Sequence, residues 1–583
     1  MLYKRNKEKQ LSDELFKNPA SEYRGSPFWG WNCELDRDEL LSRIEILKQM
    51  GFGGFHIHSR TGLITEYLGD DFMKLVSDCC EKAKRENMLV GLYDEDRWPS
   101  GAAGGIVTKD KRYRQRYLLM TVTPINAETD FDKAYSNGSA YYIAEFNVAL
   151  NEKGELASYT KTKEMPKENE TKWYVYTLTQ KPDSWYNGQT YADTLSKEAI
   201  DKFIEVTYDG YKKAVGEHFG ETVPTVFTDE PQFARKGTLP FADSKSDVTI
   251  PWTMYFDELF KERYGFDIID KLPEIFWELP NREASRARYL YHEFGTQLFT
   301  DAFSANLGNW CKNNGIELTG HMLCEESLYS QASTLGEAMR AYPHYGIPGI
   351  DILCDNYEYT TAKQAQSAAH QCGREGVMSE LYGVTGWDFD FRGHKAQGDW
   401  QAALGVTLRV LSVAWVTMKG DAKRDYPGSI NYQSGWYKEY SYIENHFARL
   451  STVLTRGKPI VKIGVIHPIE TYWLNFGPNA DTAAKRDSLD GQFHNIAEWL
   501  LSGTMDFDYI CESLLAEQVG EISDTLSVGE MKYSAIVVAG CETLRGTTVD
   551  ILNKFADMGG KIIFAGNAPK YADAVKSDRS FKL

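Results

Sequence analysis

The sequence lacks any apolar run near the ~18 residues that a membrane-spanning helix needs. Its N-terminus, MLYKRNKEKQLSDELF, carries basic residues without the apolar core of a signal peptide. The nine cysteines form neither a CxxC pair nor the dense framework of a disulfide-stapled domain. We therefore expect a soluble, cytoplasmic protein with reduced thiols and no membrane partner.

Positive charge is also scarce, because 65 Lys and Arg residues face 83 Asp and Glu residues, a net charge of −18. Such a surface repels phosphate backbones, which argues against nucleic acid as a partner. Gly101, Gly104 and Gly105 do not form the GxGxxG or GK[ST] pattern of a phosphate-binding loop. The sequence also has no GxSxG nucleophile elbow.

What the sequence does have is typical of a folded globular chain, with 42 % apolar and 25 % charged residues. Aromatic residues reach 13 %, which indicates aromatic walls for a flat, partly apolar ligand. The composition leaves the oligomeric state open, a homo-oligomer included.

Between residues 25 and 457, after an N-terminal extension of residues 1–24, short apolar runs alternate with helical stretches. Eight strands are the count of a (β/α)8 TIM barrel. The predicted strands are residues 27–32, 52–60, 88–98, 222–233, 316–327, 349–355, 376–383 and 413–421.

Two segments depart from this rhythm. Residues 113–180 carry alternating runs such as RYLLMTV and KWYVYTLTQ, which predict a β-rich insertion after the third strand. Residues 458–583 carry four more apolar strands bridged by helical segments, the pattern of a doubly wound α/β domain. This second unit stops soon after a strand, so we expect it to be truncated.

Two glutamates are the candidate catalytic residues, because active sites of such barrels lie at the carboxyl ends of the strands. Glu230 ends the fourth strand before Pro231, and Glu380 ends the seventh, on the opposite side of the barrel. Burial and a neighbouring carboxylate separate two pKa values, leaving one proton donor and one ionised group. Such a pair can cleave a glycosidic bond, although strand-end acids also serve as structural ion-pair partners.

Polar and aromatic side chains at the other strand ends are candidates for substrate binding. We expect the polar ones to hold sugar hydroxyls and Trp387 to offer a stacking surface. These candidates are Trp31, His58, Asp94, Asp96, Asp229, His321, Glu325, Glu326 and Trp387.

Two alternatives remain open from the residues alone. His56 and His58 point to the same face of a strand and, with His321, could ligate the metal of an amidohydrolase-like hydrolase. We nevertheless predict no metal ligands, because such barrels use histidines on other strands. A non-catalytic carbohydrate-binding protein would keep the pocket without the chemistry.

The segments PFWGWN, GFHIHSRTGL, LYDEDRWPSGAAGG, FTDEP, GHMLCEE and SELYG together resemble glycoside hydrolase family 106, the α-L-rhamnosidase group. More distantly, the chain is similar to the retaining barrel clan that places its acid/base after strand four and its nucleophile after strand seven. The resemblance covers about residues 25–460. The unit that follows looks like the flavodoxin- or amidotransferase-like domain found behind such barrels.

The resemblance implies a carbohydrate substrate, an α-L-rhamnoside, and Glu230 as the proton donor. The retaining clan has Asn before this acid, where this chain has Asp229. Family 106 is associated with inversion and a bound calcium, and in that case Glu325 or Glu326 would supply the base instead of Glu380. The sequence fixes no calcium ligands and implies no other cofactor.

Overall fold

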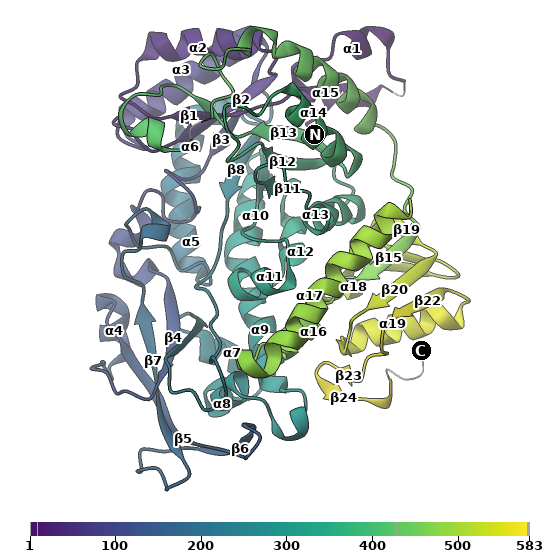
Figure 1. The fold of residues 1–583 in the computed structure, drawn as a ribbon. Coiled ribbons are helices and arrows are strands. Elements are labelled where there is room, and N and C mark those ends of the chain that lie inside the picture. The colour runs from purple at the N-terminus through teal and green to yellow at the C-terminus, as the bar shows by residue number, and fades with distance from the viewer. Residues whose placement is uncertain (1, 9, 427, 580–583) are drawn as a thin grey trace.

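The computed structural model describes residues 2–8, 10–426 and 428–579 and shows an α/β fold around a parallel barrel (Figure 1). Its nine strands follow the order β13-β12-β11-β10-β8-β3-β2-β1-β14. Because β14 follows β13 in the chain and pairs with β1, the ring is nearly closed and the predicted barrel is confirmed. The strands are β1 (Phe28–Trp31), β2 (Gly54–Ser59), β3 (Leu89–Tyr93), β8 (Thr225–Asp229), β10 (Glu317–His321), β11 (Ile347–Ile352), β12 (Val377–Leu381), β13 (Val406–Leu411) and β14 (Ala414–Trp415).

Helices cover the outside of the barrel, and α3 (Asp70–Glu86) shows how. Its residues Phe72, Val76 and Cys80 recur at helical spacing and are buried. Asn87 then ends the helix in the left-handed conformation. No helix among the described residues is both long and apolar enough to cross a bilayer. The other main helices of this part are α2 (Arg37–Gln49), α5 (Lys197–Phe203), α6 (Asp209–Val215), α9 (Arg286–Phe299), α10 (Asn306–Asn313), α11 (Leu328–Thr334), α12 (Ala338–Ala341), α13 (Tyr359–Gln371), α14 (Phe391–Ala403) and α15 (Ser441–Leu454).

Aromatic and histidine side chains fill the inside of the barrel. The ring of Phe28 lies edge-on to His58 and to Phe227, with centroids 4.8 Å apart in both pairs. Gly91 makes room for His56, since a Cβ at this position would lie 2.0 Å from the His56 ring. The interior is therefore a packed core.

The eighth strand begins earlier than the sequence predicts. The chain forms β13 beside β12, and β14 then shifts to pair with β1. The predicted segment 413–421 contains only the short β14. β13 was not predicted because Arg409 places a charged residue inside the strand. Arg409 is buried in the structure, and its Nη2 lies 2.6 Å from Glu444 Oε2 on α15.

The β-rich insertion is larger than predicted. Its antiparallel sheet has the order β6-β5-β7-β4-β9, and the last strand comes from beyond β8. β9 occupies an edge, the position where a strand tolerates a proline such as Pro251. The strands are β4 (Arg116–Thr121), β5 (Tyr141–Leu150), β6 (Leu156–Lys161), β7 (Thr171–Thr179) and β9 (Val248–Trp252), drawn in blue in Figure 1.

The C-terminal part holds four parallel strands in the order β16-β15-β20-β22. The first strand in the chain lies between the second and third, the arrangement of a doubly wound sheet. We propose that this unit begins near residue 458. The strands are β15 (Ile463–Ile466), β16 (Phe507–Ile510), β20 (Ala535–Ala539) and β22 (Lys561–Ala565); the helices are α16 (Ile469–Leu474), α17 (Asn479–Ser502), α18 (Glu512–Gln518) and α19 (Gly546–Asp557).

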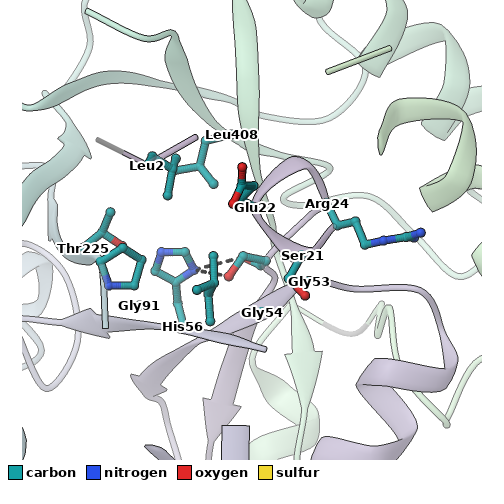
Figure 2. A pocket seen from close by; sticks show the side chains of 13 residues that line it. Leu2, Ser21, Glu22, Arg24, Gly53, Gly54, His56, Gly91, Thr225 and Leu408 are labelled. Carbon is teal, nitrogen blue, oxygen red and sulfur yellow. Dashed lines mark hydrogen bonds between the residues drawn. The ribbon is translucent and has the colours of Figure 1, made fainter. Parts of the chain in front are cut away.

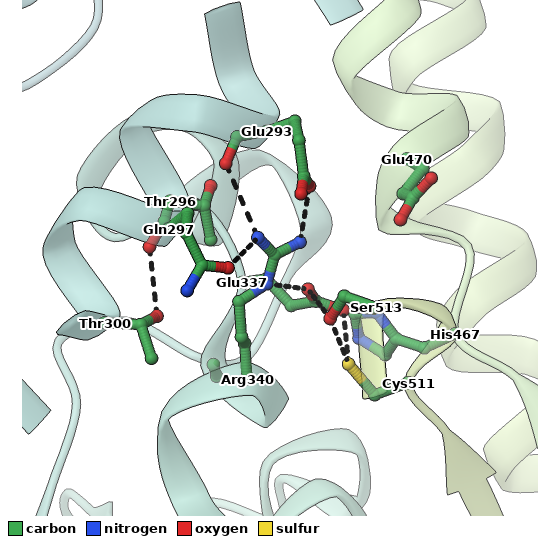
Figure 3. A network of polar contacts seen from close by, with 12 residues as sticks. Glu293, Thr296, Gln297, Thr300, Glu337, Arg340, His467, Glu470, Cys511 and Ser513 are labelled. Carbon is green, nitrogen blue, oxygen red and sulfur yellow. Dashed lines mark hydrogen bonds and ion pairs between the residues drawn. The ribbon is translucent and has the colours of Figure 1, made fainter. Parts of the chain in front are cut away.

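A buried ionic network joins this part to the barrel (Figure 3). Arg340 on α12 donates from Nη2 to Glu293 at 2.7 Å and from Nε to Glu337 at 3.0 Å. Arg545 of the C-terminal part also donates to Glu293, at 2.5 Å, and the Cys511 thiol donates to Glu337 at 3.0 Å. The two arginines thus neutralise carboxylates that are buried.

We expect Arg340→Ala to lower the free energy of unfolding by about 3–5 kcal/mol, because it leaves the buried Glu337 without its cation and removes one of the two cations that pair with Glu293. Arg392→Ala is the matched control, since Arg392 is 91 % exposed and pairs with Asp390 on the surface. Thermal melts of both variants check this. Equal melting temperatures for the two would contradict a stabilising role of the network.

Candidate active site

Three buried side chains meet at the carboxyl ends of β8, β10 and β12. His321 Nε2 lies 3.1 Å from Asp229 Oδ1 and 3.2 Å from Glu380 Oε2. Its Nδ1 faces the carbonyl oxygen of Met322 at 3.2 Å, so each ring nitrogen has an acceptor. Burial opposes a charge on the ring, but the bonds to Asp229 and Glu380 outweigh it and raise the pKa of His321 well above its usual value. The geometry therefore fits an imidazolium between two carboxylates.

Glu230 and Glu380 open onto one cavity of about 80 Å³ at this end of the barrel. The sequence predicted that these two acids would share a site, and the cavity brings them together. The lining residues are Arg60, Trp98, Asp229, Glu230, Asp351, Leu353, Glu380, Gly383, Val384, Ser412 and Tyr426.

Glu230 is held in an unusual backbone conformation. Its φ is +47°, in the left-handed region that residues other than Gly rarely adopt. Such strain is typical of functional sites. Its buried Oε2 has no hydrogen-bond partner among the described residues. Burial, together with the charge of Asp229, raises the pKa of Glu230 to about 8, so the carboxyl keeps its proton at neutral pH.

Glu380 has different surroundings. Burial, together with the charge of Asp229, raises its pKa above the usual value, and the hydrogen bond from His321 and the positive charge of Arg60 offset only part of this rise. The bond from His321 favours the ionised form of Glu380, and no such bond reaches Glu230 Oε2. The cavity thus offers one carboxyl that carries a proton and one that is paired with a cation.

Asp351 is a pocket residue that the sequence did not reveal. It lies on β11, in register with Glu380 on β12, and its buried Oδ1 has no partner among the described residues. Burial, with the charge of Glu380 next, raises its pKa well above the usual value. The sequence instead predicted that the strand would continue to residue 355, because the segment IPGIDILCD does not show where the strand stops.

Arg60 and two aromatic rings form the wall of the cavity. Asp425 accepts from Arg60 Nε and Nη2 at 3.0 Å each, so the guanidinium is fixed in a bidentate pair. Its Cζ lies 4.5 Å from the centroid of the Trp98 ring, which is beside Tyr426. A sugar ring in the cavity would meet both a planar cation and aromatic faces.

Three of the predicted binding residues support the cavity from behind. His58 stacks on Tyr93 with a centroid distance of 3.7 Å, and Tyr93 OH donates to Asp229. Asp94 accepts from Ser100 and Tyr208 outside the barrel interior, and Glu325 accepts from Tyr342. None of the three is part of the lining.

The remaining predicted residues lie elsewhere. Asp96 lines a second, neighbouring cavity, and Trp387 lies beside a small separate one. Trp31 is fully buried against Phe72 between strand and helix. Glu326, half-buried, does not line the cavity that holds Glu230.

The histidines of the metal alternative are not assembled as one ligand set. Among the described residues, no cluster of metal-ligand atoms includes His56 or His58. His56 Nδ1 donates to the carbonyl oxygen of Ser26 at 2.9 Å, beside a cavity of about 20 Å³ at the other end of the barrel (Figure 2). That volume holds about one water molecule. Burial lowers the pKa of His56 to about 4, so this ring is neutral.

Comparison with known proteins agrees with a barrel glycosidase. The family model of glycoside hydrolase family 106, described as alpha-L-rhamnosidase, matches residues 176–581. A rhamnosidase from Novosphingobium sp. PP1Y has a TM-score of 0.65 at 14 % identity, covering 98 % of this chain and 71 % of that chain. A β-galactosidase from Bacillus circulans sp. alkalophilus has a TM-score of 0.55 at 10 % identity, covering 96 % and 73 %. No curated protein matched the sequence.

The solved structures share the fold at low identity, so they support the architecture alone. The family model carries the assignment, since it spans more than half of the chain and includes Glu230 and Glu380. The chain therefore belongs to glycoside hydrolase family 106, the α-L-rhamnosidase family.

Proposed function

We propose that this protein hydrolyses a terminal α-L-rhamnosidic bond, with Glu230 as the proton donor and Glu380 as the second carboxylate. The observation that carries the proposal is the unequal pair in one cavity. Glu230 has an unpartnered oxygen and a raised pKa, whereas Glu380 is hydrogen-bonded to His321. The match to the rhamnosidase family supports the choice of sugar.

The reaction needs one proton transfer to the leaving group and one nucleophile at the anomeric carbon. The Glu230 carboxyl gives its proton to the glycosidic oxygen as the bond from that oxygen to C1 breaks. Glu380 then takes a proton from the water that attacks C1, or attacks C1 itself and is later released by water. In both routes the products are a free sugar and an alcohol, and the proton balance is closed.

Other residues of the cavity hold the sugar ring. Asp351 Oδ1 and Arg60 face the cavity with hydrogen-bonding capacity for hydroxyl groups. Trp98 and Tyr426 offer aromatic faces to the apolar side of the ring. We assign positioning roles to Asp229 and His321, because they act on substrate through Glu380.

Calcium, which the family resemblance implies, has a partial set of ligands here. Calcium takes six to eight oxygen ligands. Asp351 Oδ1 is a free buried carboxylate oxygen, and Glu380 lies next to it in register. These two residues would hold the ion, with water and sugar hydroxyls completing its shell, because a cation on Glu230 would remove the proton that it must donate. When bound, the ion would orient those hydroxyls.

A screen of aryl glycosides tests the proposal. We expect the wild type to release the aryl group from the α-L-rhamnoside in preference to other aryl glycosides. Proton NMR of the first-formed anomer then shows whether the configuration is inverted or retained. Saturable sugar binding without any product would favour the non-catalytic alternative.

We expect His321→Gln to move the acidic limb of the pH–activity profile of kcat/KM to higher pH by about one unit or more, because an opposite charge nearby lowers a carboxyl pKa by about one to three units. Glu380 must be ionised to act, and without the cation it takes up a proton at a higher pH. The basic limb, where Glu230 loses its proton, should move less.

His446→Gln is the matched control for this experiment. His446 pairs with Asp399 between α14 and α15, outside the cavity. Its profile should equal that of the wild type. An unchanged acidic limb in His321→Gln would contradict the positioning role of His321.

A further inference from the structure

A second cavity of about 850 Å³ opens beside the catalytic one. The two share Arg60, and the chain passes from Asp96 and Arg97 in the larger cavity to Trp98 in the smaller. The larger cavity, called the groove here, is built from the segments that follow β1, β2, β3 and β14. It offers far more open volume than the 80 Å³ of the catalytic cavity.

The groove is strongly polar but has no net charge. Four cationic side chains line it, namely Arg43, Arg60, Arg97 and Lys419. Four acidic side chains, Glu34, Glu39, Asp96 and Asp421, balance them. An anionic ligand would require an excess of positive charge, whereas a neutral hydroxyl-rich ligand uses donors and acceptors in similar number.

Part of the groove is rigid before any ligand binds. The guanidinium of Arg43 lies 3.8 Å from the centroid of the Tyr432 ring and also donates to Glu39 at 3.0 Å. Tyr432 in turn donates through its hydroxyl to the carbonyl oxygen of Val416 at 3.1 Å. Holding planar groups in place in advance reduces the entropy cost of binding.

The end of β1 is tied to the opposite wall of the groove. Asn32 accepts from the backbone N–H of Thr417 at 3.0 Å and donates to its carbonyl oxygen at 2.8 Å. Arg60 is likewise fixed by its bidentate pair with Asp425. These contacts therefore hold the walls of the groove in place where it adjoins the catalytic cavity.

We propose that the groove binds the saccharide part of the leaving group, so that neutral oligosaccharides with a terminal rhamnose are better substrates than small glycosides. This inference rests on the proposed function, in which the catalytic cavity holds the terminal ring. The rest of the substrate must then leave through the mouth of the barrel, where Arg60 joins the two cavities.

The test compares two substrates in the wild type and in Arg43→Ala. One is a neutral trisaccharide with a terminal α-L-rhamnose, and the other is the aryl α-L-rhamnoside. We expect Arg43→Ala to lower kcat/KM for the trisaccharide about tenfold, through KM, which corresponds to about 1.4 kcal/mol. The aryl glycoside should lose less than about twofold, since it does not reach Arg43.

Arg392→Ala is the matched control, because Arg392 is 91 % exposed, pairs with Asp390 and does not line the groove. Arg43→Lys tests the stacking, since it keeps the charge without the planar group. An equal loss for both substrates, or none for the trisaccharide, would overturn the proposal while leaving hydrolysis intact. A third substrate with a uronate next to the rhamnose should be poorer than the neutral one, and the reverse order would also overturn it.

If the wild type hydrolyses neither substrate, the proposed function fails and the groove is judged by binding. Calorimetric titration of the wild type with the trisaccharide would then support the groove if Arg43→Ala weakens binding about tenfold. No binding, or binding unaffected by Arg43→Ala, would overturn it.

Discussion

Glu230→Gln should lower kcat for a rhamnoside with a poor leaving group by ~10² or more, the usual contribution of a positioned acid. Gln fills nearly the same space but has no acidic proton to give to the glycosidic oxygen. The loss should shrink for an aryl glycoside such as the dinitrophenyl compound, whose leaving group departs without protonation. Initial rates across a series of aryl leaving groups measure this dependence.

Glu221→Gln is the control for this series. Glu221 is exposed and lies just before β8, at the end of the strand remote from Glu230. Its rates should equal those of the wild type. A loss in Glu230→Gln that is equal for all leaving groups would contradict the role of proton donor, and near-normal rates would reject the residue altogether.

Glu380→Gln should also lower kcat by ~10² or more, but by a similar factor for every leaving group. Attack at C1, or activation of the attacking water, is needed whatever group departs. A smaller variant, Glu380→Ala, leaves room for azide, which should restore turnover and form a glycosyl azide.

The azide product has the inverted configuration in either role of Glu380, so the anomer that the wild type releases separates the two roles. If Glu380 is the nucleophile, azide takes the place of its carboxylate and attacks C1 from that face of the sugar. If Glu380 is the base, azide takes the place of the attacking water, which lies on the same face. The comparison with the anomer formed by the wild type therefore decides between them, because only a retaining enzyme forms the opposite configuration in its own product. Full activity of Glu380→Gln would mean that another acid, such as Glu325, serves as the base.

Much of the fold could be read from the sequence because its strands follow simple patterns. Apolar runs such as LVGLY in β3, which is followed by Asp94, and TVFTD in β8, which ends in Asp229, mark both the strand and the position of its carboxyl end. The sequence did not predict β13 and β9 as strands. Arg409 is tolerated in β13 only because Glu444 neutralises it, and Pro251 is tolerated in β9 only because the strand lies at an edge.

The site was predictable to the same degree. Glu230 directly follows β8 and Glu380 stands one residue before the end of β12, where the barrel geometry brings them to one mouth. Asp351 stands at the same position of β11, in register with Glu380, but the sequence shows no clear end for that strand. Trp31 carries the same kind of sequence signal as Glu230, yet the alternation of the strand turns it to the outside.

The order of elements and the placement of Glu230 and Glu380 at one end of the barrel thus followed from the sequence, since periodicity and position near a strand end are local properties. Which acid keeps its proton was decided by the tertiary structure. That choice depends on His321 from β10 reaching Glu380 and not Glu230 Oε2, and on Arg60 being fixed by Asp425, far away in the chain. Burial and distance between charges set these pKa values, and neither exists before the barrel closes.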